Sequence, residues 1–443
     1  MPRRTASSRS AAAQGLGRAV RLAGMAAGVT GSYAGYMVQR LFLGAAAAEG
    51  RRLVAHARAG RVMRGQMEQL RGPMMKLGQA LSLQSDLPPQ MLEELAKLQM
   101  QAPAMHASLA RAQFTASVGC PPEQAFRTFE AAPFAAASLG QVHRATARDG
   151  TPLAVKIQYP GIISAIEHDF RWLRSAAIAG RASGHVPKDA LSEIESEILA
   201  ETDYLREARH LEFFRQGLRP LGFVSVPECR RETSTDRVLT MTRLDGQHLE
   251  AFLATRPSQA LRDRIGNRLF ELFYYQLLRL EALHADPHWG NYLFDRDGGV
   301  GLVDFGCVKR FAPGVVKQLR RSCLYPGSTA SAEFQRIIQD QFAGRGQSVA
   351  PAVERAVIAF AERFYRKVYP VSGAAARRPF DFSDGAFLRD YTRAAAELFR
   401  ARGVATHYIF LVRAETGLYA TLHRLGARVG TTAILRRLLE SRG

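Results

Sequence analysis

Two short segments in the second half of the sequence carry residues suited to catalysis. The first, residues 284–291, reads HADPHWGN, and the second, residues 304–306, reads DFG. The carboxylate of Asp286 is suited to orient or deprotonate an attacking hydroxyl or water. The amide oxygen of Asn291 and the carboxylate of Asp304 are suited to hold Mg²⁺ against triphosphate oxygens. Together these residues indicate phosphoryl transfer.

The spacing of these two segments is what makes the signal specific. DFG alone is a common tripeptide, and HADPH alone reads equally well as a loop with a chance Asp and His. Together, D-x-x-x-x-N followed by D-F-G is the arrangement used in kinase-type phosphoryl transfer. The run GLVDFG predicts a buried strand that leads into a glycine turn, so the charge of Asp304 lies where a cation offsets its burial.

A β-rich segment upstream supplies a candidate phosphate-binding lysine. Val142–Thr146 and Leu153–Ile157 are short β-rich runs joined through Asp149-Gly150, a hairpin signal. The second run contains the sequence AVKI, which matches the strand lysine of V-A-I-K. Lys156 is one of seven lysines among 60 basic residues, so its presence here is informative.

The loop that precedes this hairpin differs from the usual phosphate-binding loop. The pattern G-x-G-x-x-G is absent, and PFAAASLGQV stands in its place, with Ala135, Ala136, Ala137 and Ser138 at its centre. Alanine lacks the freedom of glycine to adopt positive φ, so we expect a stiffer loop. Its backbone N–H groups can still face phosphate oxygens.

The remaining elements follow from periodicity and turn signals. Residues 50–113 read as helical, and so do residues 162–217 and the region from Ala312 to the end. The strands and helices that we expect to position the candidate residues are a helix over Glu193–Phe214, a strand over Val238–Met241, a helix over 259–283, and two strands over Tyr292–Phe294 and Gly301–Val303 around a turn at Asp295–Gly299.

The overall composition is that of a globular protein with a strong positive charge. The chain has 443 residues, 47% of them hydrophobic, and a net charge of +20. Its four cysteines show no C-x-x-C spacing, which argues against a disulfide framework or a cysteine zinc site. The charge predicts attraction to anions. No nucleic-acid-binding module or aromatic-basic interleaving is recognisable, so we predict no nucleic-acid partner.

The N-terminal segment is compositionally distinct. Residues 1–60 contain nine Arg, no Lys and one acid, Glu49, while Leu22–Gln39 has no charge. Three interpretations fit this uncharged stretch: an interfacial or helix-pairing segment, a packed soluble helix, and a membrane span, for which it is a poor candidate because it is rich in Gly and Ala. The small-x-x-x-small spacing of Gly24/Gly28 and Gly31/Gly35 favours helix pairing.

Four motifs resemble those of the UbiB-type atypical kinase family, whose members support isoprenoid-quinone (ubiquinone) biosynthesis. The first is KLGQ at residues 76–79, the family's KxGQ signature. The second is the alanine-rich segment AAASLGQVHRA, and the third is ETD at residues 201–203, the family's ExD motif. The fourth is the pair HADPH…N and DFG. They span residues 73–306, more than half of the chain.

The resemblance implies an α+β, bilobal protein-kinase-like fold with an N-terminal helical extension that covers the active site. It implies Mg²⁺ and ATP as cofactors and disfavours phosphorylation of other proteins. The domain boundaries that we expect are 1–50 for a basic Gly/Ala-rich segment for membrane association or pairing, 51–115 for the helical extension with KxGQ, 116–245 for the N-lobe, and 246–443 for the helical C-lobe.

The resemblance also assigns roles to single residues. Lys156 would contact the phosphates and pair with Glu207, and Asp286 would be the catalytic carboxylate. Asn291 and Asp304 would be the Mg²⁺ ligands. The remaining nucleotide-binding and gating positions are Ala135, Ala136, Ala137 and Ser138 in the alanine-rich segment, Met241, Thr242, Arg243 and Leu244 in the hinge at the adenine, and Lys76, Gly78, Gln79, Glu201 and Asp203 in the gating motifs.

The sequence departs from the family pattern at two places near these residues. Trp289 replaces the second Pro of HADPHPGN, between the catalytic Asp and the metal-binding Asn. His210 stands where many relatives have the Asn of EA-x-N. We expect a cytoplasmic protein, peripherally associated with the bacterial inner membrane through its N-terminal segment. Its predicted partners are anionic lipids, quinone-biosynthesis proteins or a hydrophobic quinone precursor, and a second copy of the chain.

Three function classes compete at this point. The first is an Mg-ATP-dependent phosphotransferase or ATPase in quinone or lipid metabolism. The second is a nucleotide-gated scaffold that assembles biosynthetic proteins, and the third is a soluble small-molecule kinase. The intact set of Asp286, Asn291 and Asp304 favours the first over the second, and the KxGQ segment argues against the third.

Overall fold

The computed structural model divides the chain into two compact units. Unit 1 comprises Met1–Arg206 and Arg230–Thr242, and unit 2 comprises Glu207–Cys229 and Arg243–Gly443. The residues that the structure describes are 5–40, 43, 45–70, 88–95, 105–137, 139–179, 188–286, 289–342, 351–400 and 406–440.

Unit 1 contains an antiparallel four-stranded sheet in the order β1-β2-β3-β5. The hairpin expected at Asp149-Gly150 is confirmed, because Gly150 takes φ 89° between β2 and β3. Helix α5 packs on β1 and β3, and its Phe114 lies in the core with Val155 and Ile157. The elements of this part are α5 (Ala107–Val118), α6 (Pro122–Ala125), β1 (Thr128–Ala137), β2 (Gly140–Thr146), β3 (Pro152–Gln158) and β5 (Val238–Thr242).

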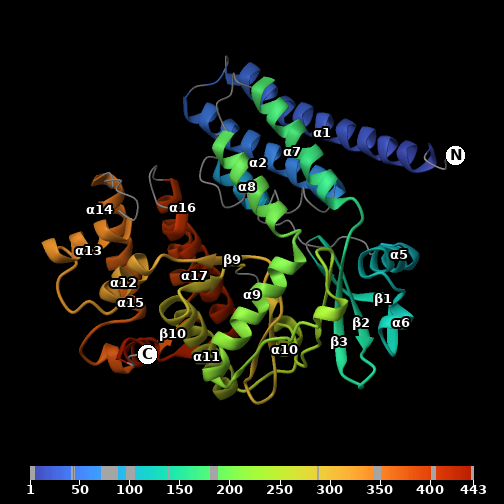
Figure 1. Cartoon of the computed structure of the whole chain (residues 1–443). Helices are drawn as coiled ribbons and strands as arrows, with labels where there is room; N and C mark the ends of the chain where they lie inside the picture. Colours follow the sequence, from blue (N-terminus) through green and yellow to red (C-terminus); the bar gives the residue numbers. More distant parts are fainter. Residues whose placement is uncertain are drawn as a thin grey trace. The chain divides into compact units, whose positions relative to one another are not determined.

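A helical cluster makes up the rest of unit 1. Its buried core includes Met25 of α1, Met67 of α2, Leu95 of α4 and Ile166 of α7. Figure 1 shows α1, α2, α7 and α8 packed together in this cluster. The helices are α1 (Thr5–Arg40), α2 (Ala45–Leu70), α4 (Pro89–Leu95), α7 (Ile162–Ala179) and α8 (Lys188–Ala200).

Helix α1 contains the uncharged stretch and packs on α2 through a glycine. A Cβ on Gly28 would lie 2.7 Å from Cγ1 of Val62, so the glycine permits close approach of the two helices. Met25 is buried, whereas Val20 and Met37 are 64% and 67% exposed. Among the described residues no helix is long and apolar enough to cross a membrane.

Unit 2 is mostly helical and carries short strands. β7 and β8 form the expected antiparallel pair, and β6 pairs with β9. The elements are η1 (Arg219–Leu221), β4 (Val224–Ser225), α10 (Leu249–Ala254), α11 (Gln259–Arg279), β6 (Ala282–His284), β7 (Tyr292–Phe294), β8 (Val300–Leu302), β9 (Val308–Arg310), α12 (Pro313–Ser322), α13 (Ala332–Phe342), α14 (Pro351–Phe360), the π-helical turn Ala361–Tyr365, α15 (Arg366–Val368), β10 (Phe380–Asp381), α16 (Gly385–Arg400), α17 (Thr406–Leu425), β11 (Arg428–Val429) and α18 (Thr431–Glu440).

Three expectations about elements are wrong. The helix expected over Glu193–Phe214 is broken at residues 201–203 into α8 and α9 (Tyr204–Gly217), because Oδ1 of Asp203 accepts the backbone N–H groups of Leu205 and Arg206 and so caps α9. The helix expected over 259–283 ends at Arg279 because residues 282–284 form β6.

The third correction concerns the alanine-rich segment. Ala135, Ala136 and Ala137 belong to strand β1 and not to a loop, with Ala137 paired to Gly140. Alanine is depleted in strands, so the pairing with β2, and not a preference of alanine itself, extends the strand to the hairpin turn. Ser138 lies outside the described residues.

Substitutions at two glycines of α2 would test the packing of α2 against α4. A Cβ on Gly60 would lie 2.8 Å from Cα of Met91, whereas a Cβ on Gly50 meets nothing within 4 Å. We expect Gly60→Ala to lower the free energy of unfolding by about 1–3 kcal/mol through overpacking. Gly50→Ala should raise it by up to about 1 kcal/mol through helix propensity. Urea titration followed by circular dichroism measures both, and equal effects would refute the close contact.

Candidate functional site

Strand β6 positions Asp286 in unit 2. The strand pairs with β9, and the N–H of Ala285 donates to the carbonyl of Cys307 at 2.9 Å, so the register continues one residue beyond the strand. Asp286 follows directly and is partly buried. Asp286 is therefore the first residue of a loop, and the start of this loop is held by hydrogen bonds to the residues that follow DFG. Pro287 and His288 lie outside the described residues.

Asn291 lies at the start of the β7–β8 hairpin. It ends the 3₁₀ turn Trp289–Asn291, and its carbonyl accepts the N–H of Val303 at 3.1 Å. Since Asp304 is the next residue, the backbone of Asn291 lies beside that of the DFG segment. Nδ2 of Asn291 is buried and makes no hydrogen bond within the described part of the chain.

Asp304 is held from both sides. The N–H of Gly306 donates to Oδ1 of Asp304 at 2.9 Å, which fixes the carboxylate within the DFG turn. Nε2 of His284 hydrogen-bonds the carbonyl of Asp304, so the last residue of β6 is tied to the DFG segment. Asp286, Asn291 and Asp304 thus follow or precede the ends of β6, β7 and β8, which these hydrogen bonds join, and their roles in metal binding and catalysis stay predictions.

The hydrogen bond between the His284 ring and the carbonyl of Asp304 was not predicted from the sequence. A carbonyl only accepts, so Nε2 of His284 carries the proton. The N–H of His284 donates to Oε1 of Gln276 at 2.9 Å, and its ring meets the ring of Phe305 edge-on at 5.6 Å. The sequence did contain a pointer to this role, because His284 is the first residue of the HADPH motif.

The donor set fits Mg²⁺. The carboxylate of Asp304 and the amide oxygen of Asn291 are hard oxygen donors of the kind that this ion takes, and it usually binds through one or two protein carboxylates plus phosphates and water. Among the described residues there is no group of three or more His, Cys, Asp or Glu side chains that could hold a metal ion. Burial, with the charge of Asp286 as a second cause, raises the pKa of Tyr292.

Helix α9 holds the middle residue of DFG by both of its peptide groups. Oε1 of Glu207 accepts the N–H of Phe305 at 3.5 Å, and Nδ1 of His210 donates to the carbonyl of Phe305 at 3.1 Å. Glu207 is 3% exposed and Phe305 is fully buried. His210, for which the sequence offered no role, therefore positions DFG. The implied pairing of Glu207 with Lys156 stays a prediction.

In unit 1 the strands place Lys156 on one defined face of the sheet. Lys156 pairs with Val142 on one side and Leu239 on the other, and directly paired residues share a face. By the same register Ala135 and Ala137 lie on this face, whereas Ala136 lies on the opposite one. Two of the three alanines thus lie on the same face of the sheet as Lys156, and their contact with a nucleotide stays a prediction.

The first part of the predicted hinge shares this face. Met241 pairs with Ala154, two residues from Lys156, and is 5% exposed. Thr242 ends β5 on the other face. The division of the chain into units falls between Thr242 and Arg243, so Arg243 and Leu244 belong to unit 2. No described contact tests their role at an adenine.

The ExD segment is attached to the face that carries Lys156. Nε2 of Gln158 donates to the carbonyl of Thr202 at 2.9 Å, and the N–H of Tyr204 donates to the carbonyl of Asp236 at 3.1 Å. Nζ of Lys156 lies 5.0 Å from the ring centroid of Tyr204, a cation–π contact. Tyr204 was not predicted from the sequence.

The structure describes only one of the two motifs to which the sequence assigned a gating function, ExD and not KxGQ. Lys76, Gly78 and Gln79 lie outside the described residues. Asp203 caps α9, so its carboxylate has a structural role, and the gating roles of Asp203 and Glu201 stay predictions. The described link between the helical cluster and the alanine-rich hairpin is Leu139, which is 1% exposed and lies in one core with Met67 and Leu95.

Trp289, the residue that replaces a proline of the family motif, has a contact of its own. The guanidinium of Arg424 on α17 lies 5.5 Å from the ring centroid of Trp289, and Arg424 also pairs with Glu250 at 2.5 Å. A cation–π contact thus restrains the loop between Asp286 and Asn291 where the relatives use the rigid ring of proline.

A unit that carries an antiparallel sheet with a strand lysine, and a mostly helical unit that carries D-x-x-x-x-N and DFG, define a protein-kinase-like protein. The chain belongs to the UbiB-type family of atypical kinases: residues 97–338 match the ABC1 atypical kinase-like domain. The predicted fold class is confirmed. The chain also resembles the solved structure of Rv3197 with erythromycin from Mycobacterium tuberculosis, with a TM-score of 0.58 and 24% identity over 84% of this chain and 93% of that one, a likeness of fold.

Relatives with curated names are similar over the same region. The atypical kinase COQ8, mitochondrial, of Saccharomyces cerevisiae is 32% identical over 58% of this chain and 52% of its own length. The protein ACTIVITY OF BC1 COMPLEX KINASE 7, chloroplastic, of Arabidopsis thaliana is 34% identical over 56% of this chain and 36% of its own length. The matched region of the chain spans about half or less of these relatives.

The positioning role of His210 gives a test within α9. His210→Ala leaves the buried carbonyl of Phe305 without its donor, and we expect the free energy of unfolding to fall by about 1–3 kcal/mol. His210→Asn keeps a side-chain N–H donor and should restore most of this loss. Gln216→Ala, at an exposed position of the same helix, should change it by less than about 0.5 kcal/mol.

Denaturant unfolding of the three variants measures these effects, and hydrogen exchange of the DFG segment reports the local one. If Asn at position 210 were as destabilising as Ala, packing and not the hydrogen bond would account for the role of His210.

Proposed function

We propose that this protein binds Mg-ATP and acts as an atypical kinase or ATPase that supports isoprenoid-quinone (ubiquinone) biosynthesis or related lipid metabolism at a membrane. The observation that carries the proposal is the convergence of Asp286, Asn291 and Asp304 at the ends of three strands, joined by the hydrogen bond of His284. A structural loop would have no need of two carboxylates and a buried, unsatisfied amide at one place.

Each residue has a role in this proposal. Bound Mg-ATP supplies the activated phosphoryl group and the charge that offsets the carboxylates. Asn291 and Asp304 hold the metal, and Asp286 orients the attacking oxygen and accepts its proton. Lys156 binds phosphate oxygens. The burial of its ammonium group against Tyr204 limits its motion, so little rotamer entropy is lost when an anion binds.

The link to quinone metabolism rests on the family and on relatives named COQ8. The membrane part of the proposal is supported by the exposed side of α1. Val20 and Met37 on α1, together with Val54 on α2, are more than half exposed, and the segment is rich in Arg. Apolar side chains next to basic residues are the composition of interfacial helices.

The catalytic part is tested by Mg-dependent ATP hydrolysis, with and without liposomes that contain cardiolipin. We expect turnover by the wild-type chain, a higher rate with liposomes, and a loss of at least about 100-fold in Asp304→Asn, since the removed charge is the one that faces the metal. Asp297→Asn, an exposed aspartate of the β7–β8 turn, is the matched control and should keep the wild-type rate.

Nucleotide binding measured by calorimetry separates the two outcomes of this test. If ATP binds with Mg²⁺ but no phosphate is released under either condition, the protein is a nucleotide-gated scaffold and the catalytic role of Asp286 is refuted.

The membrane part is tested by flotation of the full chain with anionic liposomes. Val20→Ser with Met37→Ser should weaken binding, because both side chains lose their apolar surface. Leu109→Ser, at a residue of α5 that is 51% exposed, should have no effect. Binding should fall with added salt, since each basic residue near the surface contributes about 1 kcal/mol that salt screens. Equal flotation of all three proteins would exclude α1 as the contact.

A further inference from the structure

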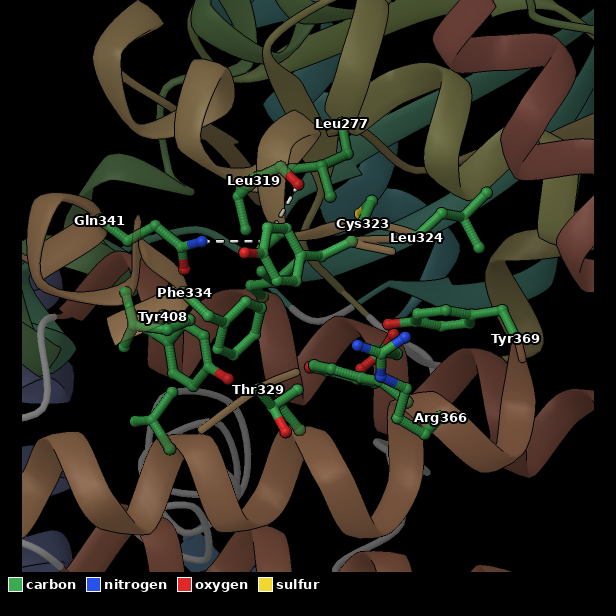
Figure 2. A pocket seen from close by; sticks show the side chains of 18 of the residues that line it. Leu277, Leu319, Cys323, Leu324, Thr329, Phe334, Gln341, Arg366, Tyr369 and Tyr408 are labelled. Carbon is green, nitrogen blue, oxygen red and sulfur yellow. Dashed lines mark hydrogen bonds between the residues drawn. The ribbon is translucent and has the colours of Figure 1, made fainter. Parts of the chain in front are cut away.

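Unit 2 contains a cavity that none of the residues predicted for nucleotide or metal lines. Its volume is about 60 Å³, and its walls come from α11, α12, α13, α14, the π-helical turn Ala361–Tyr365 and α17. Figure 2 shows the rings of Phe334, Tyr369 and Tyr408 around it, with Arg366 on one side. A water molecule occupies about 30 Å³, and a cavity that binds benzene has about 150 Å³. The cavity therefore suits a ligand of one to three heavy atoms.

One carboxylate is buried in the wall of this cavity. Glu415 of α17 is 2% exposed and accepts three phenolic hydroxyl groups. Tyr274 donates to it at 2.6 Å, Tyr391 at 2.5 Å and Tyr419 at 3.1 Å. Hydrogen bonds of this kind favour the ionised form of a carboxylate. The three tyrosines come from α11, α16 and α17, so the carboxylate joins three helices.

The charge of Glu415 has no positive partner in the described part of unit 2. Its described contacts are hydroxyl groups, and it takes part in no ion pair. Arg366, the charged residue that also lines the cavity, donates instead to the carbonyl of Gly327 at 2.7 Å. Burial raises the pKa of Glu415, whereas the tyrosine hydrogen bonds lower it. A buried charge without a counter-charge is costly, so this carboxylate either holds a proton or neutralises a bound cation.

The lining of the cavity favours a cation. Tyr274, Tyr365, Tyr369 and Tyr408 line it, and a phenol that donates its proton keeps oxygen lone pairs for a second partner. Aromatic faces attract cations as well. A single carboxylate balances one positive charge, whereas Ca²⁺ and Mg²⁺ sites normally use more anionic or oxygen ligands. We propose that the cavity binds a small monovalent cation of the potassium or ammonium class, held by Glu415 and the surrounding tyrosines.

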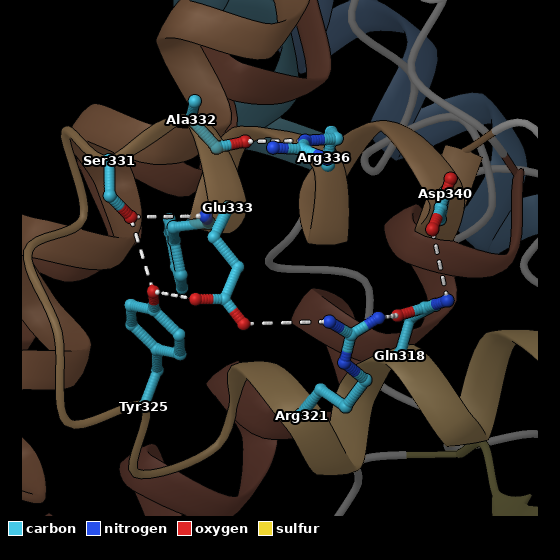
Figure 3. A network of polar contacts seen from close by, with 9 residues as sticks. Gln318, Arg321, Tyr325, Ser331, Ala332, Glu333, Arg336 and Asp340 are labelled. Atoms are coloured by element: carbon cyan, nitrogen blue, oxygen red, sulfur yellow. Dashed lines mark hydrogen bonds and ion pairs between the residues drawn. The ribbon is translucent and has the colours of Figure 1, made fainter.

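The walls of the cavity are fixed before any ligand arrives. Leu324, in the loop between α12 and α13, has φ 54°, a conformation that a residue other than glycine keeps only where its surroundings enforce it. Figure 3 shows the network that braces this loop: the hydroxyl of Tyr325 donates to Glu333 at 2.9 Å and contacts Ser331 at 3.2 Å, and Arg321 pairs with Glu333 at 3.7 Å. Preorganised walls reduce the entropy lost on binding.

The π-helical turn is a second distinctive feature of the wall. It carries Ala361 and Tyr365, both of which line the cavity. A hydrogen bond from Tyr365 also contributes to lowering the pKa of Glu415. Turns of this kind insert one residue into a helix and occur frequently at functional sites. The turn thus contributes a tyrosine to the wall that also contains Glu415.

Thermal unfolding of the full chain in different salts tests the proposal. The chlorides of potassium, ammonium, sodium and N-methylglucamine are compared at one ionic strength. At ten times the dissociation constant, a bound cation multiplies the ratio of folded to unfolded protein roughly 11-fold. For the unfolding of unit 2, which has 224 residues, we expect this to raise the midpoint by about 3–6 °C in potassium or ammonium relative to N-methylglucamine. Equal midpoints in all four salts would overturn the proposal.

Glu415→Gln keeps the size of the side chain and removes its charge, so the difference between salts should disappear in this variant. Glu397→Gln, at an exposed position of α16, is the matched control and should keep the wild-type difference. If the two variants respond to the salts alike, the cation acts elsewhere and the proposal fails.

A direct measurement covers the case in which Glu415→Gln does not fold. Crystals of the wild-type chain grown with rubidium chloride should show an anomalous peak beside Glu415, and Tyr365→Phe should weaken the peak and reduce the thermal shift. A map without a peak in this cavity would show that Glu415 carries a proton instead.

Discussion

The hydrogen bond between the side chain of His284 and the carbonyl of Asp304 is the interaction on which the candidate site in unit 2 depends. Strands β6, β7 and β8 are each three residues long, and short strands define the position of their neighbours poorly by themselves. The buried His284 connects these strands to each other and to the helical core. Its ring is hydrogen-bonded to the carbonyl of Asp304 in the DFG segment, and its backbone N–H donates to the side chain of Gln276 on α11. The geometry of the two carboxylates is therefore set by the helical core and not by the loops that carry them.

A comparable constraint operates in unit 1, where the turn of the alanine-rich hairpin carries the buried Leu139. This side chain belongs to the core of the helical cluster, with Met67 of α2 and Leu95 of α4. Because Leu139 lies within the alanine-rich segment, its packing joins the hairpin that precedes Lys156 to α2 and α4. The cluster therefore acts on the sheet through apolar packing, which is rigid and leaves little room for independent motion.

The sequence predicted the elements whose signals are local and missed those that depend on distant partners. Periodicity and the Asp149-Gly150 turn located β2 and β3, and the spacing of the motifs located Asp286, Asn291 and Asp304. The break before α9 is an exception, because its signal is local: Asp203 caps the N–H groups of Leu205 and Arg206, two and three residues on, while helical periodicity continues through it. The strand conformation of Ala135–Ala137 was missed because alanine favours helices, so only pairing with β2 decides it.

The cluster of Glu415 and its three tyrosines could not be predicted from residue spacing. Tyr274 and Tyr391 are far from Glu415 in the sequence, and only Tyr419 lies one helical turn away from it. Burial reveals it instead. Among the described residues, Lys156, Asp169, Glu207 and Glu415 are charged side chains that are almost fully buried. Lys156 and Glu207 belong to motifs, and their described contacts are a tyrosine ring and the N–H of Phe305. Glu415 belongs to no motif, yet it meets the same physical requirement of a partner for a desolvated charge. A carboxylate held by tyrosines from three helices, beside a cavity of cation size, satisfies that requirement most directly by binding a cation.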